Sequence, residues 1–192
     1  SFFKLAYQNP LINITAVNDK ADITTLTHLL KYDSVHGKFE YDSIQIASDV
    51  LMLDGNFINF YNKTNIEDIP WDKSAVDVVV DCTGVFNTRI ELEKHLLKGV
   101  NKVILSCPPK DEIKMVVLGV NDSGFKDKAI ISNASCTTNS AAPMIKIIDD
   151  FCGVKKAYVT TVHSYTSDQK LHDSPHKDLR RARSASQSIV PT

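Results

Sequence analysis

One cysteine of this chain lies where its thiol can act as a nucleophile. Cys136 belongs to the segment SNASCTTN, from Ser132 to Asn139, just where an apolar helical pattern begins. In the first turn of a helix, backbone N–H groups without partners and the positive end of the helix dipole favour a thiolate over a thiol. A single cysteine at a helix start is more often a small packed residue. The assignment therefore depends on a second reactive group.

The second group is a histidine. The segment VTTVHSYT, from Val159 to Thr166, alternates apolar and polar residues, which predicts a strand that carries His163 toward the same region. A histidine on a strand usually makes only structural hydrogen bonds. Beside a thiol, however, an imidazole can take up the proton, and the resulting ion pair stabilises the thiolate. The sequence thus predicts a cysteine–histidine pair for covalent catalysis.

The elements that must position this pair alternate between strands and helices. Helical spacing predicts a helix capped by Asp22, another over residues 88–98 and a third that begins near Cys136. The β-branched run at 76–80 is typical of a buried parallel strand. Further strands are expected at 14–17, 103–105, 115–118 and 129–131, with an antiparallel addition at 44–46, 51–53 and 57–61. We therefore predict an α/β protein with an open, mostly parallel sheet.

Ligands of such a sheet gather at the carboxyl ends of its strands. Asp19 ends the first strand, where a carboxylate can accept hydrogen bonds from the ribose of an adenine dinucleotide. Thr83 and Ser106 end two later strands and are weaker candidates for the same ligand. Without further evidence, Asp19 is as often a turn residue or a helix cap. The seven glycines contain no GxGxxG loop, so we expect that loop to precede Ser1 and the chain to be an excerpt.

The composition speaks against several classes of protein. The 192 residues are 43% hydrophobic, enough for a core, and the formal net charge of −1 gives no general attraction to nucleic acid or anionic membranes. No apolar run approaches the length of a membrane span. The four cysteines form no CxxC pair, which favours reduced thiols in a cytoplasm. We expect Cys82, Cys107 and Cys152 to be buried packing residues.

A basic run supports a different class, a module that binds nucleic acid or a protein partner. Residues 177–183 contain four lysines and arginines, but no aromatic residues lie between them, and Asp173 and Asp178 dilute the charge. His172 and His176 have helical spacing without the acidic motif of a zinc site, so we interpret them as surface or loop residues and predict no metal. Nucleic-acid binding is therefore not expected as the primary role.

The motifs taken together resemble a known family. SNASCTTN, TTVHSYTSDQ, HLLKYDSVHGKF, VDCTGVF, LGVN and HKDLRRARS occur in order along nearly the whole chain. They are similar to phosphorylating glyceraldehyde-3-phosphate dehydrogenases, most of all to the bacterial form. The resemblance implies a Rossmann-like NAD-binding domain over 1–135, without its first strand and glycine-rich loop. It also implies the start of an α+β catalytic domain over 136–192, and a cytoplasmic homotetramer of glycolysis or gluconeogenesis.

The resemblance also implies roles for single residues. Cys136 is the nucleophile and His163 its base in the oxidation of D-glyceraldehyde 3-phosphate to an acyl phosphate. Asp19, Thr83 and Ser106 hold NAD, and Asp19 favours NAD over NADP. The positions that hold the phosphate groups of the substrate and inorganic phosphate are Ser135, Thr137, Thr166 and Arg181.

One relative remains an alternative. Erythrose-4-phosphate dehydrogenase shares the cysteine motif and the VDCTGV segment, but it typically lacks the threonine of Tyr165–Thr166. For the 192 residues alone the resemblance implies little or no activity, because the expected phosphate loop lies outside them.

Overall fold

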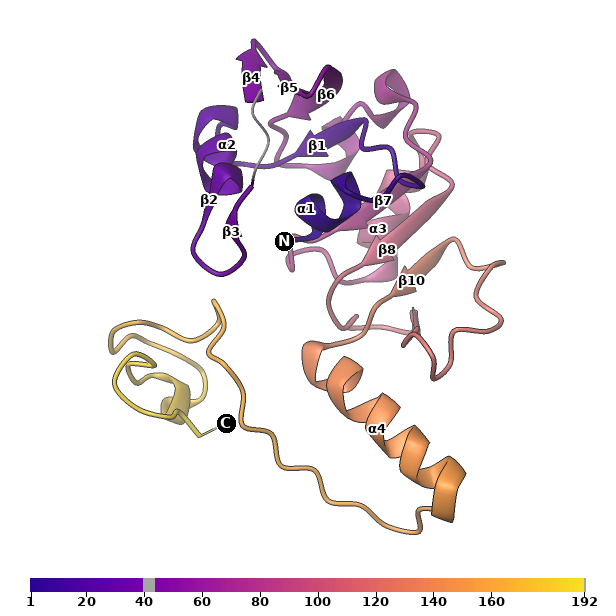
Figure 1. The fold of residues 1–192 in the computed structure, drawn as a ribbon, viewed down its shortest axis with the longest axis vertical. Helices are drawn as coiled ribbons and strands as arrows, with labels where there is room; N and C mark the ends of the chain where they lie inside the picture. Colours follow the sequence, from indigo (N-terminus) through magenta and orange to yellow (C-terminus); the bar gives the residue numbers. More distant parts are fainter. Residues whose placement is uncertain (40–43, 192) are drawn as a thin grey trace. The chain divides into compact units, whose positions relative to one another are not determined.

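The computed structural model describes residues 1–39 and 44–191, which form two compact units. The first unit spans Ser1–Cys152 and the second Gly153–Thr192 (Figure 1). In the described part of the chain, no helix is both long and apolar enough to cross a membrane.

The first unit contains a four-stranded sheet with the order β1-β6-β5-β4. Its strands are β1 (Ala16–Asn18), β4 (Ile44–Ala47), β5 (Val50–Leu53) and β6 (Asn56–Tyr61). β1 runs parallel to β6, whereas β4, β5 and β6 are antiparallel. Asp54 and Gly55 join β5 to β6 and both have positive φ, as a tight hairpin turn requires. The predicted antiparallel addition is confirmed.

A second four-stranded sheet is entirely parallel. It has the order β7-β8-β10-β9 and consists of β7 (Val78–Asp81), β8 (Lys102–Leu105), β9 (Lys114–Met115) and β10 (Ile130–Ser132). The α/β class is confirmed, but the strands that we expected in one open sheet form two. Among the described strands, β1 pairs only with β6 and β7 only with β8. Side chains connect the two sheets instead. The rings of Tyr61 in β6 and Trp71 pack edge to face, with 6.1 Å between their centroids, and Trp71 belongs to the core cluster of the parallel sheet.

Local sequence signals set the helix boundaries. In α2 (Ile23–Lys31), the Asp22 carboxylate accepts a hydrogen bond from the Thr25 backbone N–H at 2.8 Å, the expected cap. α3 (Arg89–Leu96) begins with a capping box between Thr88 and Glu91. The remaining elements are α1 (Phe2–Tyr7), α4 (Cys136–Cys152), the short strands β2 (Tyr32–Asp33) and β3 (Gly37–Lys38), and the 3-10 turns η1 (Ile66–Asp68), η2 (Trp71–Ser74) and η3 (Leu179–Arg181).

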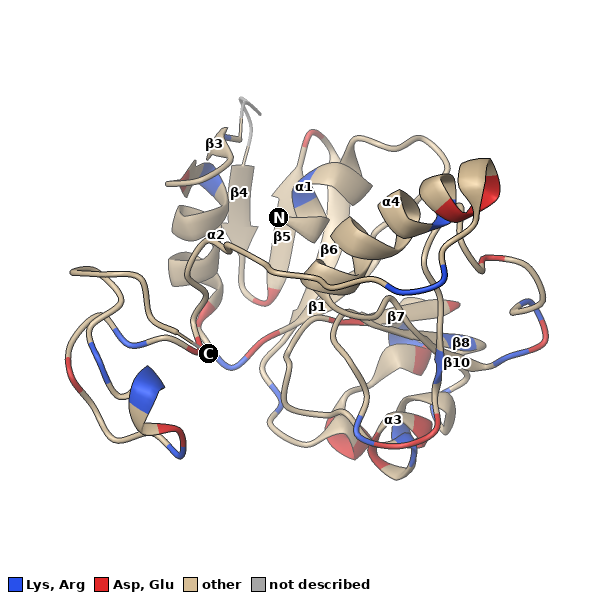
Figure 2. Ribbon diagram, turned by 90° about the horizontal axis from the view of Figure 1, so that it is seen from below, with Lys and Arg blue, Asp and Glu red and all other residues tan. Residues whose placement is uncertain are grey.

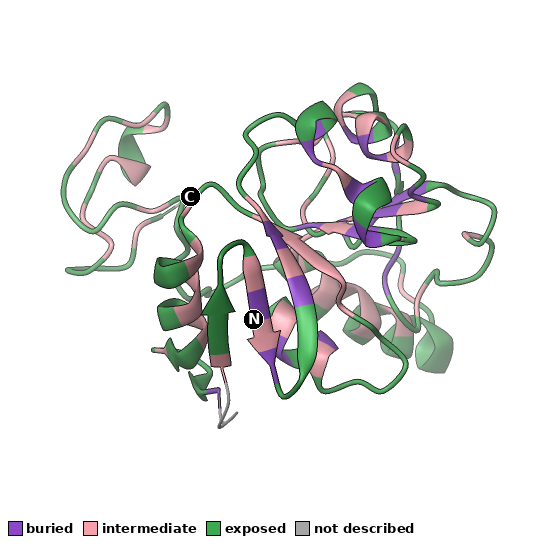
Figure 3. Cartoon of the chain, turned by 90° about the horizontal axis from the view of Figure 1, so that it is seen from above, coloured by how far each residue is buried: buried purple, intermediate pink, exposed green. Residues whose placement is uncertain are grey.

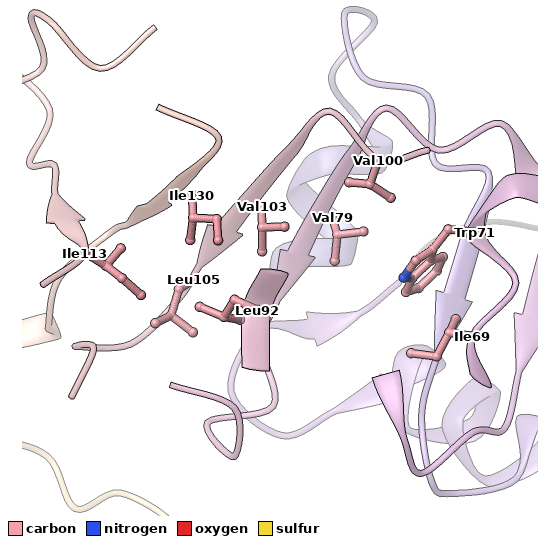
Figure 4. Packing of buried hydrophobic residues seen from close by; sticks show 9 residues of the cluster. All are labelled: Ile69, Trp71, Val79, Leu92, Val100, Val103, Leu105, Ile113 and Ile130. Atoms are coloured by element: carbon pink, nitrogen blue, oxygen red, sulfur yellow. The ribbon is translucent and has the colours of Figure 1, made fainter. Parts of the chain in front are cut away.

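The main core lies against the parallel sheet. Leu92 of α3 is fully buried and belongs to one apolar cluster with Val103 and Leu105 of β8. The cluster extends from Ile113 at one end to Trp71 and its neighbour Ile69 at the other (Figure 4). Burying a side chain of this size contributes about 1.5–3 kcal/mol. This core fixes the carboxyl ends of the parallel strands, where the candidate site begins.

The second unit is built differently. No described residue from 153 to 191 is buried, and η3 is the regular element found there (Figure 3). The predicted strand from Val159 to Thr166 is wrong, because this stretch forms no strand. An alternating pattern becomes a strand only when a neighbour completes the hydrogen-bond ladder, and no described segment pairs with it.

Candidate active site

Apart from Asp19, the predicted site residues of the first unit follow three adjacent parallel strands. Asp81 of β7 and Ser132 of β10 both pair in register with Leu105 of β8. Because these strands are parallel, the residues after them meet at the same edge of the sheet. Thr83 follows β7, Ser106 follows β8, and the segment that leads to Cys136 follows β10.

The turn before Cys136 is anchored in the core. Ser132 is fully buried; its hydroxyl donates to the Cys107 carbonyl at 2.7 Å and accepts from the Ala134 N–H at 3.0 Å. The Asn133 N–H donates to the Leu105 carbonyl at 2.8 Å. Ala134 has φ 56°, a left-handed conformation that costs a residue other than glycine about 1–2 kcal/mol. These hydrogen bonds offset that strain and fix the direction in which the chain enters α4.

Polar side chains then start the cysteine helix. The Ser135 hydroxyl accepts from the Thr138 N–H at 3.0 Å, which is the geometry of a helix N-cap. The Asn139 amide group donates to the carbonyls of Asn133 and Ser135 at 2.7 and 2.9 Å. Cys136 is therefore the first residue of α4 and is exposed. The predicted placement of the thiol at a helix N-terminus is confirmed.

The end of β7 is organised around a buried carboxylate. Asp81 Oδ1 accepts from both the N–H and the hydroxyl of Thr83, at 2.8 and 2.7 Å. The Thr83 oxygen in turn accepts from the Val85 N–H at 3.1 Å, and Gly84 between them has φ +67°. The hydroxyl hydrogen of Thr83 is thus used within the turn. A ligand here would meet the exposed backbone of the turn and a hydroxyl oxygen that can only accept.

The pKa of Asp81 reflects these contacts. Burial opposes ionisation of this carboxyl group, but the neighbouring His95 ring and the hydrogen bonds from Thr83 outweigh it and hold the pKa below its ordinary value. Asp81 is therefore ionised at neutral pH and remains a strong acceptor for the Thr83 turn.

Asp19 lies exposed directly after β1. Its N–H donates to the Tyr61 carbonyl at 3.1 Å, and its Oδ1 accepts from the Ala21 N–H at 2.9 Å. The sequence also allowed Asp19 to be a turn residue or a helix cap. The hydrogen bond from Ala21 fits a turn residue, and the cap of α2 is Asp22. An exposed carboxylate at a strand end suits the ribose of a dinucleotide. With Thr83 and Ser106 also exposed at strand ends, the described residues fit NAD.

The second unit brings Thr166 and Arg181 into one loop cluster. Thr166 and Gln169 close a turn, in which the Gln169 side chain accepts from the Thr166 N–H at 2.9 Å. Within that turn Asp168 accepts from Arg181 Nη1 at 2.7 Å. Arg181 Nε is buried and has no hydrogen-bond partner among the described residues. Two of the four predicted anion-binding residues are therefore close in the chain's second unit.

The basic run that suggested nucleic-acid binding is largely neutralised. Arg180 pairs with Asp178 at 2.6 Å, and Arg183 pairs with Asp173 at 3.0 Å. The hydrogen bond from Arg180 lowers the pKa of Asp178 to about 2, so this pair is fully charged at neutral pH. Acidic and basic segments alternate along this part of the chain (Figure 2). Such paired charges weaken the case for a phosphate-backbone interface.

His163 is exposed in the second unit, on a segment without regular structure. Its Nδ1 lies 2.6 Å from the Ser164 carbonyl oxygen. Because a carbonyl oxygen only accepts, Nδ1 carries the hydrogen, and in the neutral ring the lone pair lies on Nε2. That tautomer suits a base acting through Nε2. Cys136 belongs to the other unit, so the cysteine–histidine pair stays a prediction.

The other cysteines and the histidines of the second unit were also interpreted from the sequence. Cys82 and Cys152 are exposed, so the prediction of buried packing residues is wrong for them, whereas Cys107 is partly buried and packs against the core cluster. Cys82 lies just beyond the last paired residue of β7, and Cys152 ends a helix in which no residue is buried. His176 lies in a loop, as expected. Among residues 1–39 and 44–191, no cluster of three His, Cys, Asp or Glu side chains could hold a metal ion.

Sequence reasoning missed the residues that hold the site in place. Ser132, Asp81 and Asp168 each bind a predicted site segment, but none was singled out. The available signal was Asp81 after a β-branched run, since a charged residue at the end of a buried strand needs partners.

Comparison with known proteins gives two family matches. Residues 1–89 match the model described as glyceraldehyde 3-phosphate dehydrogenase, NAD binding domain. Residues 135–192 match the model described as glyceraldehyde 3-phosphate dehydrogenase, C-terminal domain. The second family match begins at residue 135, whereas the two compact units divide after Cys152. The domain boundary after residue 135 stays a prediction.

Individual relatives agree with the family matches. The chain is 45% identical to a glyceraldehyde-3-phosphate dehydrogenase of Streptomyces coelicolor over 193 residues, covering 100% of this chain and 57% of the relative. It is 46% identical to that of Geobacillus stearothermophilus, covering 99% of this chain and 57% of the relative. The relative from Thermotoga maritima is 45% identical, with 99% and 58% covered. The chain thus spans little more than half the length of these relatives.

Proposed function

Since the chain belongs to the glyceraldehyde-3-phosphate dehydrogenase family, we propose that the whole protein oxidises D-glyceraldehyde 3-phosphate with NAD and inorganic phosphate. One observation carries the proposal. Cys136 is exposed at the first turn of α4, behind a turn that buried hydrogen bonds hold in place. The helix N-terminus favours the thiolate form of Cys136, and the fixed turn holds its sulfur in one direction.

The reaction begins at sulfur. The Cys136 thiolate adds to the aldehyde carbon, and the carbonyl oxygen takes up a proton from the His163 imidazolium to give a hemithioacetal and a neutral imidazole. His163 then accepts that hydroxyl proton as the carbon–hydrogen bond breaks, which leaves a thioester on Cys136. An oxygen of inorganic phosphate attacks the thioester carbon, and the thiolate leaves as the acyl phosphate forms. The Cys136 N–H and His163 are the donors proposed for the oxyanion of both additions.

Asp19, Thr83 and Ser106 are the residues proposed to hold NAD. When bound, NAD supplies a nicotinamide ring that accepts the hydride. Asp19 binds the ribose hydroxyls, and its charge disfavours the 2′-phosphate of NADP. Ser106 lies beside the Thr83 turn, because its N–H donates to the Asp81 carbonyl at 3.0 Å. One ligand can therefore contact the ends of β7 and β8 together.

The phosphate groups of the two substrates are assigned to Ser135, Thr137, Thr166 and Arg181. Hydroxyl and guanidinium groups donate to anionic oxygens. Arg181 is already oriented by Asp168, and its buried Nε retains an unused hydrogen. A phosphate that binds Nη1 of Arg181 would compete with the Asp168 carboxylate, which accepts from the same nitrogen.

The substrate assignment rests on one comparison of rates. We expect the whole protein to form NADH from glyceraldehyde 3-phosphate with a higher kcat/KM than from erythrose 4-phosphate, measured by absorbance in phosphate buffer. A preference for erythrose 4-phosphate would replace the proposed substrate and leave the cysteine chemistry in place.

Thr166→Ala tests the anion site. Loss of the hydroxyl donor should raise the KM for the aldehyde or for phosphate about threefold or more. Thr160→Ala, an exposed threonine of the same segment, is the control. If both KM values stay at the wild-type level in Thr166→Ala, this residue does not bind either anion.

We also propose a cytoplasmic homotetramer. Its support is the family, together with four cysteines that form no disulfide in the structure and so fit a reducing compartment. Light scattering of the purified whole protein should give four times the monomer mass, and a monomeric mass would contradict the assembly.

A further inference from the structure

A buried line of polar groups runs from the core to the Thr83 turn. Trp71 Nε1 donates to His95 Nδ1 at 3.0 Å, and His95 Nε2 lies 3.6 Å from Asp81 Oδ2. The exposed fractions of Trp71, His95 and Asp81 are 6%, 3% and 4%. The three residues come from η2, α3 and β7, so separate elements have been brought together around one carboxylate.

The indole group determines the state of the imidazole. An indole N–H can only donate, so His95 Nδ1 must accept and the hydrogen of the neutral ring lies on Nε2. That hydrogen faces the Asp81 carboxylate, with Oδ2 3.6 Å from Nε2, and among the described residues Nε2 has no partner within hydrogen-bond distance. A buried N–H of this kind attracts an ionised carboxylate and restrains its orientation.

The two oxygens of Asp81 therefore have different tasks. Oδ2 faces His95 in the core, and Oδ1 holds the N–H and hydroxyl of Thr83. Rotation of the carboxylate would weaken both Thr83 contacts at once. The orientation of the exposed turn thus depends on an imidazole that does not reach the surface.

We propose that His95 is a positioning residue for NAD, acting through Asp81 on the turn Cys82–Gly84. This inference rests on the proposed function, because that function places the cofactor at Thr83. His95 touches neither substrate nor cofactor. Its loss should raise the KM for NAD, while the KM values for the aldehyde and phosphate, which bind elsewhere, stay the same.

Two variants separate the two sides of the ring. The amide group of His95→Gln lies near the former position of Nε2, so this variant keeps a donor toward Asp81. The amide group of His95→Asn lies near the former position of Nδ1, so this variant keeps an acceptor for Trp71 but has no donor toward Asp81. Both put one amide in the same buried position, so their general cost is similar. We expect His95→Asn to raise the KM for NAD about tenfold, because Asp81 loses the buried N–H that faces it, and His95→Gln to stay within about threefold.

Affinity measurements separate a positioning effect of His95 from a loss of folded protein. KM does not depend on how much of the enzyme is folded, so a partly unfolded variant still reports. Calorimetric titration of NAD without aldehyde measures the same effect as a Kd, whichever aldehyde is the substrate. Equal Kd values for NAD in His95→Asn, His95→Gln and wild type would overturn the positioning role. Equal rises in the KM values for NAD, the aldehyde and phosphate would also overturn it, and both results would leave the proposed function in place. Wild-type protein that binds no NAD would overturn the proposed function and this inference together.

Discussion

The turn that leads to Cys136 and the loop that carries Arg181 are held in place by opposite means. The cysteine turn depends on the buried Ser132 hydroxyl and on backbone hydrogen bonds to the end of β8. The arginine loop depends on ion pairs between side chains that are exposed or half-buried, such as that of Arg181 with Asp168. Buried hydrogen bonds hold a fixed geometry, whereas exposed ion pairs are screened and exchange partners readily. The first arrangement suits bond formation at one atom, and the second suits an anion that enters and leaves.

The largest effect is expected at the thiol. Cys136→Ser in the whole protein should lower the rate of NADH formation by about a thousandfold or more, because an alcohol at this position is a far weaker nucleophile. Cys152→Ser, which changes the exposed thiol at the other end of α4, is the matched control and should retain the wild-type rate. A fully active Cys136→Ser enzyme would contradict the mechanism.

The next effect tests the buried side of the comparison. Ser132→Ala should lower the free energy of unfolding by about 1–3 kcal/mol, since the Ala134 N–H and the Cys107 carbonyl lose their common partner. Ser184→Ala removes a hydroxyl that bonds to the Leu171 carbonyl in the exposed unit and should cost less. Urea denaturation measures both. Equal costs would mean that burial does not distinguish the two regions.

Arg181→Ala tests the exposed side. Loss of the guanidinium should raise the KM for phosphate or for the aldehyde about tenfold, with little change in the free energy of unfolding. Arg183→Ala removes a neighbouring arginine that pairs with Asp173 and is not assigned to an anion. If both variants bind the substrates equally well, the loop contributes general charge and Arg181 has no special role.

The smallest effect concerns acid. The folded pKa values of Asp81 and Asp178 lie below that of an unfolded aspartate, about 3.9. Each group therefore contributes stability that is complete above that value and is lost as pH falls toward the folded pKa. Asp81→Asn should flatten the fall in stability below about pH 4, measured by urea denaturation at several pH values. Asp178→Asn should change it less, because Asp178 is only half-buried and its partner Arg180 is exposed, so water screens the pair. The reverse order would show that the exposed loop controls acid stability.

The sequence by itself determined the local features of this protein. The cap of α2 by Asp22, the capping box of α3, the hairpin at Asp54–Gly55 and the helix start at Cys136 all depend on residues close together in the chain. Their hydrogen bonds and backbone preferences act over a few residues, so the pattern alone predicts them. The family motifs added roles that no local rule supplies.

Tertiary structure decided which distant groups meet. Trp71, His95 and Asp81 are separated in the sequence and come together only when η2 and α3 pack against β7. The alternating segment at 159–166 lacks a strand because a ladder needs a partner that the segment cannot supply. Exposure of Cys82 likewise depends on where pairing of β7 ends. Hydrogen bonding and burial over long distances arise from packing, and packing is a property of the whole fold.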